Sequence, residues 1–443
     1  MAEIRPFRAW RYRVEPGGSI DRYVSPLFDV VTPAQLEQLY RIPQNSIHLS
    51  VPRREAGVDT PEAIVQSWKA RGDIALEPIP ALYAYYQHFA LPGEPEPLVR
   101  KGFIALVKAT PWADGNVLRH ESTMPDAVKD RLQTLKETHM QVNPTHGLYH
   151  DPAFSLEPIF DEAMRAPLFE TEDYQGVRDV IAVVQDRAAI RQALELMQQQ
   201  TIVLADGHHR YEAAVAYRRE MLGRIKNPTG NEPWQYHLMY LTNDCSPDLR
   251  IMATHRLLKG IGTVPPDEWR RRLEVFFEVT DVDDPTTLPE RIAGKPGTFG
   301  FILPGTAWKL RIRPGMVESM EWQFPDAVKQ LDLTMLHYFI GWRILGVEGS
   351  QQRKTPLIGY ERNFFRCLQE LSAGRADAVV VTNPVPVSAV RQVAELGQTM
   401  PPKSTYFYPK VVAGFVMSSL IDDEFYSHAD TGLGLATAAP TAG

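Results

Sequence analysis

Cysteine is scarce in this chain, which contains only Cys245 and Cys367 among its 443 residues. The two lie far apart in the sequence, and neither belongs to a CxxC or CxxH pattern. Small extracellular domains are stapled by several disulfides, and structural zinc sites use clustered cysteine and histidine ligands. The composition therefore argues against a disulfide scaffold and against a structural zinc site, and it fits a reducing compartment.

Long apolar runs and a surplus of basic residues are also missing. No segment is apolar over the roughly 20 residues that cross a bilayer, and residues 1–6 contain no apolar stretch typical of a secretory signal. Acidic residues outnumber basic ones by 54 to 47, so the surface as a whole does not resemble that of a nucleic-acid-binding protein. We expect a cytoplasmic protein without a membrane or nucleic-acid partner.

What is present is the composition of a globular protein, with 44% hydrophobic and 23% charged residues. The length predicts two or three packed units. Strand-like and helix-like segments alternate between residues 180 and 216, which predicts an α/β fold with mixed sheets. We expect an N-terminal α/β unit at 1–150, a phosphate-binding core at 151–260, a C-terminal α/β unit at 261–430 and a flexible tail at 431–443.

The strongest local signal is the segment 201–216, where an apolar run, a polar turn and an alanine-rich helical pattern follow one another. The pattern predicts a buried strand at 201–204 and a helix that begins within about two residues of His208. Gly207 would permit a tight turn and the close approach of a ligand to the backbone. The amides and the positive dipole end of a helix start favour an anion, so we expect this turn to bind phosphate.

The side chains of this turn offer the chemistry that phosphate binding needs. Arg210 presents a planar fork that suits phosphate or carboxylate. Asp206 could hold Mg²⁺ or accept a proton, and His208 and His209 could titrate near neutral pH. The alternative is that Asp206 caps the helix and that the histidines are surface residues. Zinc is less favoured, because adjacent histidine side chains diverge and no HExxH spacing occurs here.

Two further segments carry candidate site residues. Residues 119–123, Arg-His-Glu-Ser-Thr, precede a predicted helix at 125–142, and Glu121 is a candidate base or metal ligand. Residues 400–410 form a proline-stiffened loop in which Lys403 and Lys410 suit phosphate oxygens. The alternatives are a plain capping segment for the first and an aromatic-packed surface loop for the second. We expect both segments to converge with 206–210 on one pocket.

These motifs, together with residues 28–33, Phe-Asp-Val-Val-Thr-Pro, and with His255-Arg256, resemble a prokaryotic family known as domain of unknown function 1015. The resemblance runs in order from about residue 5 to 420, but the family name implies no activity. More distantly, Gly207-x-x-Arg210-x-x-Ala213 is similar to the phosphate-binding box of the ParB/sulfiredoxin superfamily, which includes free-serine kinases. This second resemblance implies a ParB/sulfiredoxin-like core within 151–260 and nucleotide phosphates as ligands.

The resulting hypothesis is a Mg²⁺-dependent phosphotransferase that acts on a small hydroxy amino acid. The resemblance points to free L-serine or phosphoserine, with ATP, ADP or pyrophosphate as the phosphate donor. Candidate catalytic residues are Glu121, Asp206, His208 and His209, with Asp206 also as the Mg²⁺ ligand; candidate phosphate-binding residues are Gly207, Arg210, Lys403, Ser404, Thr405 and Lys410; candidate substrate-binding residues are His120, Thr123 and Arg131. The alternatives are a ParB-like nucleotide-binding regulatory protein without turnover and a metal-dependent phosphodiesterase. The acidic net charge and the lack of a recognisable DNA-binding module count against the regulatory protein.

Overall fold

The computed structural model describes residues 1–15, 18–262, 264–349 and 351–425. The chain divides into two compact units, each built from separate stretches of sequence. Unit 1 comprises Met1–Arg119, Thr123–Leu249 and the segment from Pro409 onward, and unit 2 comprises His120–Ser122 and Arg250–Tyr408. The tail expected at 431–443 lies outside the described residues.

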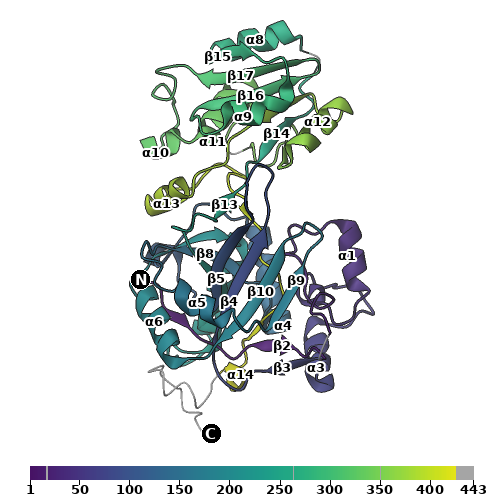
Figure 1. Ribbon diagram of the computed structural model, residues 1–443, viewed down its shortest axis with the longest axis vertical. Helices are drawn as coiled ribbons and strands as arrows, with labels where there is room; N and C mark the ends of the chain where they lie inside the picture. The colour runs from purple at the N-terminus through teal and green to yellow at the C-terminus, as the bar shows by residue number, and fades with distance from the viewer. Residues whose placement is uncertain (16–17, 263, 350, 426–443) are drawn as a thin grey trace. The chain divides into compact units, whose positions relative to one another are not determined.

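The main sheet of unit 1 has the strand order β6-β11-β8-β12-β5-β4-β10-β9, with β1 paired to β5 (Figure 1). Its strands are β1 (Ile4–Arg5), β4 (Leu82–Phe89), β5 (Leu98–Lys108), β6 (Val117–Leu118), β8 (Thr145–Tyr149), β9 (Phe169–Glu172), β10 (Arg178–Val184), β11 (Ile202–Asp206) and β12 (Tyr236–Asn243). The pairs β12–β8 and β11–β6 are parallel, and the other pairs are antiparallel. The sheet is therefore mixed.

Both faces of this sheet are buried, because alternate residues along its central strands enter different hydrophobic cores. On β4, Leu82 and Ala84 belong to one core, and Tyr83 and Tyr85 belong to the other. The first core also contains side chains of α5 (Glu157–Ala163), α6 (Arg187–Met197) and α7 (His208–Leu222). The second contains side chains of α2 (Ile47–Ser50), α3 (Pro61–Arg71) and the segment 411–417.

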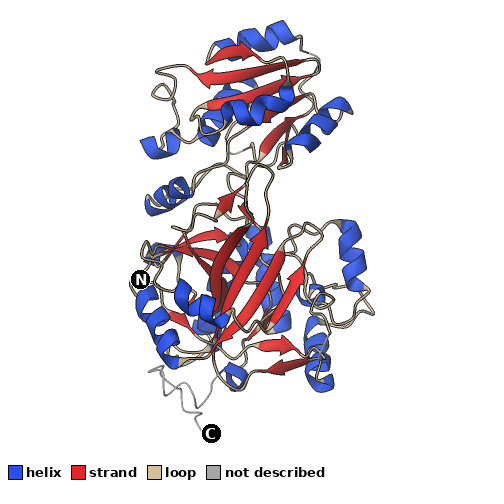
Figure 2. Cartoon of the chain, in the orientation of Figure 1, coloured by secondary structure: helices blue, strands red, loops and turns tan. Residues whose placement is uncertain are grey.

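The other α-helices and paired strands of unit 1 lie outside the main sheet (Figure 2). They are the helices α1 (Pro33–Tyr40), α4 (Pro125–Thr138) and α14 (Asp422–Phe425), the paired strands β2 (Trp10–Tyr12) and β3 (Ile74–Leu76), and the paired strands β7 (Met140–Gln141) and β21 (Ser418–Ser419). β21, near the end of the described chain, forms backbone hydrogen bonds with β7, which precedes residue 150. This pairing attaches the segment after residue 409 to unit 1.

Unit 2 contains an antiparallel sheet with the strand order β15-β17-β16-β19-β14-β18. Its strands are β14 (His255–Leu258), β15 (Phe277–Asp281), β16 (Thr298–Leu303), β17 (Thr306–Ile312), β18 (Ile358–Glu361) and β19 (Ala378–Val381). Its helices are α8 (Pro266–Glu274), α9 (Leu288–Ile292), α10 (Asp326–Lys329), α11 (Asp332–Met335), α12 (Phe364–Ser372) and α13 (Val387–Glu395), with a π-helix over Leu336–Ile344. A separate ribbon pairs β13 (Arg250–Ile251) with β20 (Phe407–Tyr408).

The predicted α/β fold with mixed sheets is confirmed. The bounds of the units differ from the consecutive parts expected from the sequence, because strands from both 1–150 and 151–260 share the main sheet of unit 1. Hydrogen bonding between distant strands, which a local reading cannot see, decides this division. Among the described residues, no helix combines the length and the apolar composition that crossing a bilayer requires.

Candidate functional site

The turn between β11 and α7 requires glycine at its centre. Gly207 has a φ of 90°, in the left-handed region that other residues rarely adopt. A Cβ at this position would also lie 2.6 Å from Cγ2 of Thr145 on β8. The predicted buried strand and helix start are confirmed, since β11 is buried over 202–205 and α7 begins at His208. Asp206 thus lies at the end of β11, and Gly207 alone separates it from α7.

Asp206 is held between two cationic side chains. Its Oδ2 accepts a hydrogen bond of 2.9 Å from Nη2 of Arg210, one helical turn onward, and its Oδ1 forms an ion pair with Lys410. All three side chains are at most 15% exposed. Burial alone would raise the pKa of Asp206, but the charges of Lys410 and Arg210 outweigh it and hold the pKa far below its ordinary value. The carboxylate is therefore ionised at any physiological pH.

The guanidinium of Arg210 also ties the start of α7 to the loop before β8. Its Nη1 donates to the carbonyl oxygens of Pro144 and Asn143, at 2.6 and 3.3 Å. Together with Asp206, these acceptors engage both terminal nitrogens of the fork. Arg210 thus connects α7 to the loop before β8. A phosphate that bound the same nitrogens would have to replace some of these acceptors.

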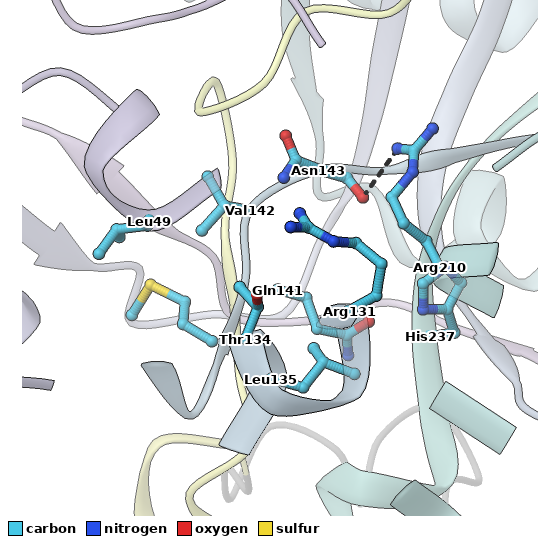
Figure 3. A pocket seen from close by; sticks show the side chains of 10 residues that line it. Leu49, Arg131, Thr134, Leu135, Gln141, Val142, Asn143, Arg210 and His237 are labelled. Carbon is cyan, nitrogen blue, oxygen red and sulfur yellow. Dashed lines mark hydrogen bonds between the residues drawn. The ribbon is translucent and has the colours of Figure 1, made fainter. Parts of the chain in front are cut away.

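Arg210 and Arg131 line a common small cavity (Figure 3). Its volume is about 40 Å³, enough for a few water molecules at about 10–15 Å³ each. The residues that line it, all in the described part of unit 1, include these two arginines and His237 but no aspartate or glutamate. The ring of Phe28 lies 4.4 Å from the Arg131 guanidinium carbon and 5.9 Å from that of Arg210. Each arginine already has a carboxylate partner, Asp130 for Arg131 and Asp206 for Arg210.

Two buried histidines of this region, His208 and His237, are neutral at physiological pH. Burial lowers the pKa of His208 to about 3, and burial together with the charge of Arg210 lowers the pKa of His237 to about 3. His208 therefore differs from the expectation that it titrates near neutral pH. The Nε2 of His209 accepts a hydrogen bond of 3.0 Å from the backbone N–H of Met124, which requires a neutral ring with its proton on Nδ1.

Buried polar side chains in the main sheet position Lys410. Nε2 of Gln87 on β4 donates to the carbonyl oxygen of Lys410, at 2.9 Å. Arg100 on β5 is fully buried and donates to the side chain of Gln87 and to the carbonyl oxygen of Pro409. These contacts fix the backbone at the point where the ammonium of Lys410 reaches Asp206.

The same network contains a buried carboxylate that sequence reasoning missed. Asp179 on β10 is 1% exposed and accepts hydrogen bonds from Tyr85, at 2.6 Å, and from Gln87, at 2.7 Å. Burial raises its pKa to about 7, although these hydrogen bonds oppose the shift. The sequence does contain a signal for this network, because Gln87, Arg100 and Asp179 each lie near the end of a strongly apolar strand pattern. A polar side chain in a sheet that is buried on both faces needs a hydrogen-bond partner.

The other predicted site residues fall into both units. In unit 1, the hydroxyl of Thr123 donates to the carboxylate of Glu212 on α7. In unit 2, Nε2 of His120 lies 2.8 Å from Oγ1 of Thr405, and the carbonyl oxygen of His120 accepts a hydrogen bond from Met400. The structure thus brings His120 together with the 400–405 loop, as it brings Lys410 together with Asp206. The predicted site residues in unit 1 are Asp206, Gly207, His208, His209, Arg210, Thr123, Arg131 and Lys410. Those in unit 2 are His120, Glu121, Lys403, Ser404 and Thr405.

The 400–405 loop is shaped by contacts inside unit 2. Lys403 has a φ of 55°, and the Ser404 hydroxyl donates to the carbonyl oxygen of Pro401, at 2.6 Å. The buried Arg256 donates to the carbonyl oxygens of Pro402 and Lys403, at 3.4 Å each. The hydroxyl of Ser404 therefore stabilises the turn, and a phosphate would have to compete with a backbone carbonyl for it.

Several solved structures show distant likeness to the chain. A conserved hypothetical protein from Pyrococcus furiosus is 12% identical with a TM-score of 0.34, and the match covers 69% of this chain and 92% of that one. A free serine kinase in complex with AMP is 12% identical with a TM-score of 0.35, covering 70% and 90%. SbnI with a C-terminal truncation, from Staphylococcus aureus, is 10% identical with a TM-score of 0.34, covering 72% and 87%. Likenesses this distant carry no argument about what this chain binds.

A comparison of the sequence with curated proteins finds no match. Residues 4–334, more than half of the sequence, match a family described as "Protein of unknown function (DUF1015)". The family resemblance drawn from the motifs is therefore confirmed, whereas the ParB/sulfiredoxin-like core stays a prediction. The chain belongs to the family of proteins of unknown function DUF1015.

Proposed function

We propose that the chain binds a phosphate-bearing ligand at the start of α7 and transfers a phosphoryl group to or from the hydroxyl of a small amino acid, with L-serine as the first candidate. The observation that supports this most is the cluster in which Lys410 and Arg210 meet one carboxylate, Asp206. Helix α7 begins there without a side-chain cap and without an acidic residue in its first turn. Two cations, one anion and the positive end of a helix dipole leave a net attraction for phosphate.

Lys410 is the residue best suited to change partners when the ligand binds. Its ammonium is a point charge on a flexible stem, whereas the guanidinium of Arg210 is fixed through Nη1 by two backbone carbonyl oxygens and through Nη2 by Asp206. A phosphate dianion carries more charge than the carboxylate of Asp206, so it would draw Lys410 toward itself. Arg210 would then keep Asp206 compensated while Lys410 neutralises the transferred group.

The reaction also needs a group that accepts the proton of the serine hydroxyl as the oxygen bonds to phosphorus and the donor's bridging oxygen leaves. Asp206 is poorly suited, because its low pKa makes it a weak base. His209 is the better candidate in unit 1, since its Nε2 carries no proton, but it must release the N–H of Met124 before it can accept one.

Mg²⁺ does not fit Asp206 as this residue is arranged. Both carboxylate oxygens contact cationic side chains, and a divalent cation there would be repelled by both. Phosphate donors themselves bring Mg²⁺, which commonly keeps waters and bonds to phosphate oxygens with few protein ligands. We therefore propose Mg²⁺ as a companion of the donor and assign it no ligand in this chain.

A second function, nucleotide binding without turnover, is favoured by one observation. The carboxylate nearest the proposed phosphate site is neutralised on both oxygens and is not available as a base. Such a site could hold an anion and report its presence without chemistry. The two functions differ in one measurable property, which is whether a phosphorylated product forms.

Phosphorus NMR tests the proposal directly. The full chain is incubated with L-serine and ATP, ADP or pyrophosphate, and separately with phosphoserine and AMP, ADP or phosphate, each with and without Mg²⁺. Phosphoserine formation, or its loss in the reverse direction, supports transfer. Tight donor binding by calorimetry without any product would favour the binding function, and absence of both would refute the phosphate site.

The matched variants are Lys410→Met and Lys101→Met. Lys101 also forms an ion pair, with Asp161, but its side chain is 37% exposed. We expect K410M to lower turnover by at least tenfold, because one charged hydrogen bond is worth about 1.5–3 kcal/mol, and K101M to match the wild type. Equal activity of folded K410M would remove Lys410 from the site.

A further inference from the structure

A second polar cluster lies in unit 1, outside the site described above. Strands β8 and β12 are parallel neighbours whose last residues, Tyr149 and Asn243, are paired in register. His150 follows β8 directly, and Asp244 and Cys245 follow β12. Because parallel strands end at the same edge of a sheet, residues 94 and 95 positions apart in sequence come together there.

The three side chains direct one donor atom each toward a common point. Nδ1 of His150 lies 2.8 Å from Oδ1 of Asp244 and 3.4 Å from Sγ of Cys245, and the sulfur lies 3.6 Å from the same carboxylate oxygen. Atoms bound to zinc at about 2.0–2.3 Å with tetrahedral angles lie about 3.3–3.6 Å apart. Two of the three separations already fall in that range, and the third needs to open by about 0.5 Å.

The backbone around these residues is fixed by hydrogen bonds. The side-chain oxygen of Asn243 accepts from the backbone N–H groups of Asp151 and Cys245, both at 3.1 Å. The N–H of Asp244 donates to the carbonyl oxygen of Tyr149, at 2.8 Å. One asparagine therefore braces both strand ends, which keeps the three donor atoms close before any ion binds.

The arrangement does not match a catalytic cysteine triad. In such a triad the thiol and the carboxylate contact opposite nitrogens of the imidazole, so that the ring can relay a proton between them. Here both groups face the same nitrogen, Nδ1 of His150. Donor atoms that converge on one point are typical of a metal-binding site.

We propose that His150, Asp244 and Cys245 form a binding site for a divalent transition-metal ion of borderline softness, with Zn²⁺ as the first candidate. The set of one sulfur, one nitrogen and one oxygen donor suits Zn²⁺ and its neighbours and disfavours Mg²⁺ and Ca²⁺, which take oxygen ligands. The His150 side chain is 54% exposed and that of Asp244 is 5% exposed, so the site opens to solvent on the histidine side. Three protein ligands leave a coordination position for water or an external ligand.

Cobalt(II) is the most informative probe, because a thiolate ligand produces a charge-transfer absorption that nitrogen and oxygen ligands lack. The chain contains two cysteines, and the other, Cys367, is fully buried on α12. The untagged, reduced full chain is titrated with Co²⁺ as wild type, Cys245→Ser and Cys367→Ala. We expect a thiolate band for the wild type and C367A, its loss in C245S, and displacement of the band by Zn²⁺.

A second variant guards against misfolding of C245S. His150 is exposed, so His150→Ala should fold as the wild type does, and we expect its affinity for Zn²⁺ to fall by more than about tenfold, since even outer ligand contacts contribute that much. A wild type without the thiolate band, or Zn²⁺ affinities that are equal in the wild type, H150A and C245S, would overturn the site. The readout is spectroscopic and does not depend on the proposed phosphoryl transfer.

Discussion

The cluster around Asp206 and the cluster of His150, Asp244 and Cys245 both lie at strand ends of the same sheet, yet they differ in burial and in construction. Asp206 is ionised and enclosed between two cations, with every partner at most 15% exposed. The second cluster has a mostly buried carboxylate beside a histidine that is 54% exposed. The first is an internal charge balance that a ligand must disturb, whereas the second has donor atoms open to an incoming ion. This difference should be measurable in the stability of variants at the two clusters.

The largest effect is expected from removing the central carboxylate. Asp206→Ala takes the counter-charge from Arg210 and Lys410 inside the fold, which should cost about 3–5 kcal/mol of the free energy of unfolding. Asp244→Ala should cost at most about 1 kcal/mol, because its partner His150 is largely solvated. Urea denaturation followed by circular dichroism measures both. Similar losses for the two variants would contradict the comparison.

The next effect concerns pH. Burial raises the pKa of Asp179 to about 7 in the folded chain, from an ordinary value of 3.8. The folded state therefore binds more protons than the unfolded state between about pH 4 and 7, and stability from this residue falls as pH rises through that window, by up to about 4 kcal/mol. Asp206 acts oppositely, since its lowered pKa gives stability that is lost only as pH falls below about 4.

Asp179→Asn isolates this contribution, because an amide oxygen can still accept from Tyr85. We expect the variant to lose most of the decline in stability between pH 5 and 8, measured by urea denaturation at each pH. The unfolding free energy of the wild type over the same range serves as the reference. An unchanged slope in D179N would show that Asp179 is ionised at pH 5 in the folded chain.

A smaller effect is expected at the turn. Gly207→Ala must adopt a left-handed backbone, at about 1–2 kcal/mol, and must also displace Thr145, whose Cγ2 lies 2.6 Å from the added carbon. Gly115 has a φ of 69° with nothing within 4 Å of such a carbon, so Gly115→Ala carries the backbone cost alone. We expect G207A to lose more stability than G115A in thermal unfolding. Equal losses would mean that Thr145 moves aside freely.

The smallest effect is expected at the open cluster without metal. His150→Ala should change the free energy of unfolding by about 0.5 kcal/mol or less, as exposed substitutions do. With Zn²⁺ at a hundred times its dissociation constant, the wild type should gain about 2.7 kcal/mol, and H150A should gain little. A wild type that gains nothing from Zn²⁺ would make the two clusters alike in not binding metal ions.

The two clusters also mark how far sequence reasoning could go. Residues 206–210 are contiguous, so the sequence alone predicts the apolar strand, the glycine turn and the helix start. β11 and α7 begin within one residue of the expected positions. His150 and Cys245 are 95 positions apart, and only the pairing of β8 with β12 brings them together. The scarcity of cysteine argued against a structural zinc site, but it could not address a site built from strand ends.

The networks behind Asp206 were harder to foresee for a related reason. Gln87, Arg100 and Asp179 lie on three neighbouring strands, and which of them meet depends on strand order and register. The low pKa of Asp206 and the pKa of about 3 for His208 depend on burial and on Lys410, which lies 204 positions away from Asp206. Local patterns indicate which groups are present, whereas long-range packing decides their charge.

The return of residues 409–425 to unit 1 has a consequence for synthesis on the ribosome. Phe415 and Met417 enter a core of unit 1, Ser418 and Ser419 pair with β7, and Lys410 reaches Asp206. Unit 1 therefore cannot close its core or balance its buried charges until the residues of unit 2 have been translated. Chains that stop near residue 408 would leave apolar surface and Asp206 exposed, which makes them substrates for chaperones and proteases. Truncation before residue 409 would therefore disturb unit 1 as well as unit 2.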